Sequence, residues 1–107
     1  MKQSQKLTKE LIDPYFEEWQ RLNTELLAAH HQRNANAAGL MVQGIRLFNA
    51  LLEECGGELL PLNYQDRMGF IKTHPAQFAA FRQLDELFTE MKKTISSKRA
   101  QLNKAAN

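Results

Sequence analysis

Apolar residues recur every three or four positions after Pro75, which is the spacing of one face of an α-helix. The stripe consists of Phe78, Phe81, Leu84, Phe88, Met91 and Ile95, and Leu87 widens it. Proline is well suited to a first helical position, so the pattern predicts a helix over about 75–101. The near-heptad spacing favours packing against another helix at a shallow crossing angle.

A short helix is predicted over about 63–73 from the prolines that flank it. Pro61 holds its neighbours extended, and Pro75 disfavours a helical residue before it. Asn63 is expected to accept hydrogen bonds from the first turn through its side chain, as an N-cap does. His74 is expected to cap the final helix.

Two further helices are predicted over about 14–32 and 35–55. Asp13 as N-cap and Pro14 at the first helical position mark the start of the earlier one. The apolar face of that helix consists of Tyr15, Trp19, Leu22, Leu26 and Ala29. In the later helix, Gly39 and Gly44 each cost about 1 kcal/mol relative to alanine, which predicts the close approach of a neighbouring backbone. Gly56 and Gly57 are expected to end that helix in the left-handed conformation.

Together these elements predict an all-α fold, a compact antiparallel bundle of three long helices and one short helix. A chain of 107 residues is long enough for one hydrophobic core. We expect a single domain over 13–101, preceded by a mobile or short-helical leader over 1–12 and followed by a frayed tail over 102–107.

The composition is ordinary for a globular protein, with 43% hydrophobic and 24% charged residues. The lone cysteine, Cys55, cannot form an internal disulfide framework, which favours a reducing cytoplasm. No apolar run has the length of a signal peptide or a membrane span, so we expect a cytoplasmic protein with no membrane contact. The formal charge of +2 is too small to imply a polyanionic partner.

The region over 60–95 resembles the YpoC-like family, small uncharacterised proteins of low-GC Gram-positive bacteria. The residues that carry the resemblance are Pro61, Asn63, Asp66, Arg67, Phe70, Ile71, Pro75, Phe78, Phe81, Gln83, Leu84, Leu87, Phe88, Glu90 and Met91. The resemblance implies a helical, cytoplasmic protein and brings no established activity or catalytic residue.

No residue pattern predicts catalysis, a cofactor or a metal site. His30 and His31 are adjacent and diverge by about 100° on a helix, so they cannot bind one ion as an i, i+4 pair does. Cys55 is expected at a helix C-terminus, where the dipole disfavours a thiolate. The adjacent acids also diverge, and these pairs are Glu53 with Glu54 and Asp85 with Glu86.

The polar residues that stand out form a predicted interaction or ligand corner. They are Asp66, Arg67, His74 and Gln83. We expect Arg67 to pair with Asp85 or Glu86 and to clamp the short helix onto the long one. The alternative is a small-ligand or enzyme site near Arg67 and His74, where the guanidinium holds an acidic group.

The C-terminal segment is basic and suggests a second alternative, weak binding of nucleic acid. Its cations are Lys92, Lys93, Lys98, Arg99 and Lys104. No aromatic residues are interleaved for base stacking, and lysines near a helix C-terminus are also favoured by the macrodipole. Our leading expectation is therefore a non-enzymatic protein that acts through a protein partner or self-association, with Phe16, Leu27 and Leu87 among its exposed apolar residues.

Overall fold

The computed structural model describes the backbone of residues 7–106 and the side chains as far as Leu102. This part of the chain contains helices and no strand, which confirms the predicted all-α bundle. The helices are α2 (Lys9–His31), α3 (Ala37–Glu54), α4 (Tyr64–Thr73) and α5 (Phe78–Ala106).

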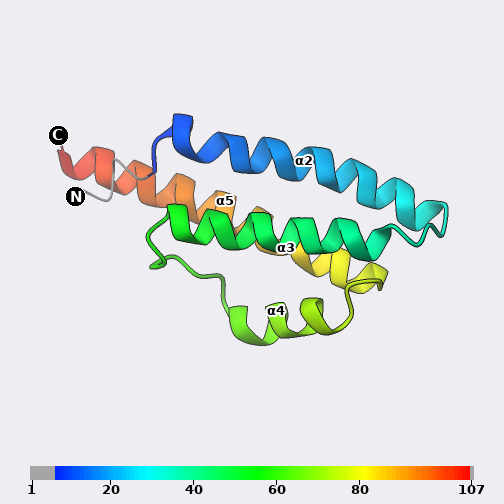
Figure 1. Ribbon diagram of the computed structural model, residues 1–107. Coiled ribbons are helices and arrows are strands. Elements are labelled where there is room, and N and C mark those ends of the chain that lie inside the picture. The colour runs from blue at the N-terminus through cyan, green and yellow to red at the C-terminus, as the bar shows by residue number, and fades with distance from the viewer. Residues whose placement is uncertain (1–6, 107) are drawn as a thin grey trace.

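The three long helices form the body of the molecule, and α4 lies outside it (Figure 1). Helix α2 packs most extensively on α3, and both also pack on α5. Helix α4 packs mainly on α5, on the side of the bundle away from α2 (Figure 1). The short helix therefore covers one side of the bundle, where its residues Met68 and Ile71 are buried.

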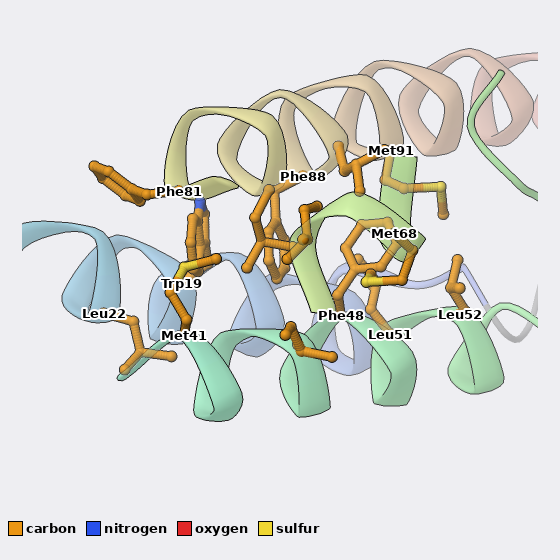
Figure 2. Close-up of a cluster of buried hydrophobic side chains, with 14 of the residues drawn as sticks. Trp19, Leu22, Met41, Phe48, Leu51, Leu52, Met68, Phe81, Phe88 and Met91 are labelled. Carbon is orange, nitrogen blue, oxygen red and sulfur yellow. The ribbon is translucent and has the colours of Figure 1, made fainter. Parts of the chain in front are cut away.

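The core is centred on Trp19 of α2, whose side chain is 2% exposed. Its indole stacks on Phe88 with ring centroids 4.4 Å apart, and Phe48 meets Phe88 edge to face at 4.9 Å. Figure 2 shows these rings between α2, α3 and α5, with Met68 of α4 and Met91 of α5 filling the space beside them. The predicted stripe of α5 supplies much of this core.

Of the three apolar residues that we expected on the surface, one is exposed, one is half-buried and one is buried. Leu27 is exposed, which confirms the expectation. Leu87 is completely buried, so that prediction is wrong. Phe16 is half-buried, with its ring edge to face against Phe88 and 6.3 Å from it between centroids. The face of α5 that enters the core is wider than the three-and-four spacing alone indicated.

The predicted start of the first helix at Asp13 and Pro14 is wrong, because α2 begins at Lys9 and contains Pro14. A proline inside a helix removes one backbone hydrogen bond and clashes with the preceding turn, which costs about 3 kcal/mol or more. Leu7 and Ile12 are almost completely buried, and full burial of each such side chain contributes about 1.5–3 kcal/mol. Packing of these two residues therefore offsets the cost. Of the expected leader over 1–12, residues 1–6 lie outside the described part.

The last helix starts and ends later than predicted. Residues 75–77 form a turn, in which Gln77 donates from its backbone N–H to the carbonyl of His74 at 3.1 Å. The turn is needed because the chain must reverse between α4 and α5. The helix begins at Phe78 and continues to Ala106, so the expected frayed tail is helical as far as that residue.

The C-terminus of α3 and the N-terminus of α4 lie close to the predicted positions, but Asn63 does not cap α4 in the way that we expected. Gly56 and Gly57 have φ of 83° and 74°, which confirms the left-handed closure of α3. Asn63 precedes α4 with φ of 57° and makes no side-chain cap. Instead, its carbonyl accepts from the Arg67 N–H at 3.0 Å. Asparagine tolerates the left-handed region better than most residues, which suits this turn.

The two glycines of α3 do not mark the approach of a neighbouring backbone. A Cβ at Gly44 would lie 2.9 Å from the Trp19 ring and 3.0 Å from Leu84 Cδ2, both of which are side-chain atoms. A Cβ at Gly39 would meet no atom within 4 Å. Gly44 is therefore required by the size of the indole, and Gly39 is not required by packing.

Candidate functional site

Arg67 clamps α4 onto α5, as predicted, but through a different carboxylate. Its guanidinium donates to both oxygens of Glu90, with Nη1 to Oε1 at 2.9 Å and Nη2 to Oε2 at 2.5 Å. We expected Asp85 or Glu86 as the partner, and that prediction is wrong. Asp85 is turned toward α2 and Glu86 is exposed, which leaves Glu90 one turn further along.

The same guanidinium has two other acceptors. Arg67 Nη1 donates to the backbone carbonyl of Leu62 at 2.9 Å. The Gln83 amide lies against the guanidinium, and with its oxygen turned inward it accepts from Arg67 Nε and, at 3.1 Å, from Nη2. The bonds to Glu90 raise the pKa of Arg67 and lower that of the Glu90 carboxyl. Intramolecular acceptors therefore use the donors that an anionic ligand would need.

The four residues of the predicted corner do not form one site. Arg67 and Gln83 come together, whereas Asp66 is exposed in the first turn of α4. His74 ends α4 and does not cap α5, because its Nδ1 lies 3.3 Å from the carbonyl of Phe70. Glu90 was not predicted from the sequence as the partner of Arg67, although its seven-residue separation from Gln83 places both residues on one face of a helix.

A second polar cluster, which was not predicted from the sequence, joins α2 to α5. Asp85 Oδ1 accepts from Trp19 Nε1 and from Asn23 Nδ2, both at 2.9 Å. A buried indole N–H usually finds an acceptor, and that rule was the available signal. The two bonds fix the register between the two helices and hold the indole against Gly44.

The basic residues of α5 do not form one cationic surface. Lys92 and Arg99 line a groove of about 420 Å³ beside α2, where Lys92 Nζ lies 5.9 Å from the centre of the Phe16 ring. Arg99 Nε donates to the carbonyl of Leu7 at 2.6 Å. Lys93 and Lys98 line a different, outer surface, and the side chain of Lys104 lies outside the described part.

His30 and Cys55 occupy packing positions, whereas His31 is exposed. The ring of His30 stacks on Phe81 at 5.6 Å, and its Nε2 is buried with no hydrogen-bond partner. Cys55 is buried, and burial raises the pKa of its thiol to about 11. Within the described residues, no three His, Cys, Asp or Glu side chains gather as a group that holds a metal ion.

An apolar surface lies beside the Arg67 clamp, in the segment that leads into α4. Leu62 is 79% exposed and Leu60 is 51% exposed, whereas Pro61 between them is buried. We call Leu60 and Leu62 the leucine surface. Arg67 fixes its position through the carbonyl of Leu62.

These features define a small helical bundle whose main polar clusters join its own helices. A family model described as YpoC-like protein matches residues 9–103, and the chain belongs to this family. The predicted resemblance is thereby confirmed and extends over nearly the whole chain. None of the described helices is long and apolar enough to cross a membrane.

The chain is also similar to a protein of Bacillus subtilis (strain 168) described as uncharacterized protein YpoC. The two are 33% identical over 95 residues, a match that covers 73% of this chain and 58% of the relative. The chain therefore spans less than two thirds of that relative's length. No solved structure matches the chain.

Proposed function

We propose that this domain is a non-enzymatic module that binds a protein partner in the cytoplasm through the leucine surface. The observation that supports the proposal is the 79% exposure of Leu62 in a segment that the fold itself holds in place. Isolated exposed apolar residues are common on proteins. Two exposed leucines on either side of a buried proline, fixed by an arginine, are a more specific arrangement.

The structure of this segment favours binding, because little conformational entropy remains to be lost. Pro61 restricts the backbone, and the bond from Arg67 to Leu62 fixes the carbonyl. A preorganised apolar surface loses less free energy on association than a mobile one does. The Arg67 clamp would then stabilise the binding surface as well as the position of α4.

The absence of catalysis is part of the proposal and rests on how the polar groups are used. Arg67, the leading candidate for holding an acidic ligand, donates to Glu90 and to the Leu62 carbonyl, and the Gln83 amide lies against it. The raised pKa of Cys55 keeps its thiol protonated near neutral pH, which is unsuitable for a nucleophile. A single buried thiol also fits a reducing compartment.

The test is a capture experiment from the native cytoplasm with covalent cross-linking and mass spectrometry. The wild-type chain is compared with Leu62→Ser and with Val42→Ser, a control in which an exposed apolar residue of α3 is changed. We expect Leu62→Ser to lose a partner that both other proteins retain. Neither substitution removes a buried side chain, so thermal melts should coincide.

Sedimentation of the same three proteins distinguishes self-association from binding to another protein. A partner retained equally by Leu62→Ser and by wild type would refute the leucine surface. Concentration-dependent dimers that Leu62→Ser abolishes would identify the partner as a second copy.

A further inference from the structure

We infer that the partner segment that docks on the leucine surface is basic and amphipathic, and belongs to another protein. The inference rests on the proposed function, and it concerns the charge of the residues around Leu60 and Leu62. An exposed carboxylate lies on each side of the two leucines along the chain, and a third lies on α5 near Arg67.

The first two carboxylates are placed by the chain itself. Glu58 is exposed, two residues before Leu60 in a segment that forms no helix. Asp66 is exposed in the first turn of α4, one helical turn before Phe70 and next to Arg67 in the chain. Neither forms an ion pair among the described residues.

The third carboxylate, Glu86, lies on α5. It is exposed, and it acts on the same guanidinium because its charge contributes to the raised pKa of Arg67. Glu86 also forms no ion pair within the described part of the chain. Two exposed acids therefore flank the leucines along the chain, and a third acts on the arginine that holds the Leu62 carbonyl.

Two cations near the Arg67 clamp are associated with Glu90. Arg67 is neutralised by Glu90, to which it donates two hydrogen bonds. Lys93 lies close enough to Glu90 to help lower the pKa of that carboxyl. The two cations are thus associated with one carboxylate, and Glu58, Asp66 and Glu86 remain to attract a partner.

A partner with leucine-like anchors and flanking lysines or arginines satisfies both features. Apolar anchors on one helix face would cover Leu60 and Leu62, and the flanking cations would lie against the carboxylates. Charges at the rim of an interface chiefly speed association and select the partner, and salt screens them. An acidic amphipathic segment would meet like charges on the same surface.

The experiment uses the full chain and two synthetic helical peptides with the same leucine positions. One peptide carries lysine at every polar position and the other carries glutamate, and both are titrated at low and at raised salt. We expect the lysine peptide to bind about tenfold more tightly at low salt, an advantage that raised salt should reduce. Leu62→Ser should abolish the binding.

Charge reversal locates the effect on the protein. Asp66→Lys should weaken the affinity of the protein for the lysine peptide about threefold to tenfold. Glu10→Lys is the matched control, because Glu10 is the acid in the first turn of α2 as Asp66 is in α4. Glu58→Lys should act like Asp66→Lys without altering a helix end, which separates binding from any loss of helix stability.

The outcomes separate this inference from the proposed function. Equal binding of both peptides, or equal effects of Glu10→Lys and Asp66→Lys, would overturn the inference that the partner is basic. The proposed function would still be supported if Leu62→Ser lost a captured partner. Self-association that Asp66→Lys abolishes would also overturn it, because a second copy's basic α5 would then be the occupant. Preference for the lysine peptide, lost in both Asp66→Lys and Glu58→Lys, supports it.

Discussion

Substitution of the two glycines of α3 by alanine should change stability in opposite directions. At Gly44 the added Cβ would lie 2.9 Å from Cζ3 of Trp19, closer than real Cβ atoms approach a neighbour. The indole cannot move aside easily, because it is stacked on Phe88 and bonded to Asp85. Overpacking of this kind costs about 1–3 kcal/mol, and the gain in helix propensity returns up to about 1 kcal/mol.

The net result for Gly44→Ala is a loss of up to about 2 kcal/mol when the full propensity gain is returned, or up to roughly 10 °C in Tm for a domain of this size. Gly39→Ala is the control on the same helix, since its Cβ would meet nothing within 4 Å. It should stabilise the protein by about 0.5–1 kcal/mol. The measurement is urea unfolding of the three proteins, followed by circular dichroism. A Gly44→Ala variant at least as stable as wild type would refute the packing around Trp19.

Three further predictions follow from the polar and buried groups. Glu90→Gln should cost about 1 kcal/mol at neutral pH, a modest value because the carboxylate is 42% exposed. Because Arg67 lowers the pKa of Glu90, this stabilisation is complete above the ordinary glutamate pKa and is lost as pH falls through the lowered value. Urea unfolding at acid pH should therefore find Glu90→Gln and the wild type closer in stability. With the pKa of Cys55 raised to about 11, a thiol reagent at neutral pH should label the folded chain far more slowly than the urea-unfolded chain, and equal rates would contradict its burial. Trp19→Phe should destabilise the protein by about 1–3 kcal/mol in the same unfolding assay, because it removes the bond to Asp85 and part of the stack, and a loss below about 0.5 kcal/mol would argue against both.

The helices could be predicted from the sequence because their signals are local. The stripe of α5 and the glycines after α3 act within one or two turns. The glycine prediction is confirmed, and the stripe is buried from Phe81 to Ile95, whereas Phe78 at its start is 46% exposed. The prediction of where α2 starts was wrong because that start depends on contacts that are not local. Pro14 is a strong local signal for a helix start, and it was outweighed by burial of Leu7 and Ile12 against parts of the chain far away in sequence.

The partners within the polar clusters also depend on how distant parts of the chain pack together. The sequence identified Arg67 as a clamp, but the choice among Asp85, Glu86 and Glu90 depends on how α5 is rotated in the bundle. That rotation places Asp85 under Trp19 and Asn23, which removes it from the reach of α4. A buried indole N–H needs a hydrogen-bond acceptor, but the sequence alone does not show which residue supplies it.

The exposure of Leu62 could not be predicted either, because apolar residues beside a proline are as suitable for a core as for a surface. Its position follows from two features that act together. Asn63 in the left-handed conformation turns the chain into α4, and Arg67 holds the Leu62 carbonyl against the helix. With its backbone held inward, the side chain is left outside the core. If this account is correct, Arg67→Met should weaken partner binding even where α4 remains folded, because it removes the bond that orients Leu62 while keeping a side chain of similar length.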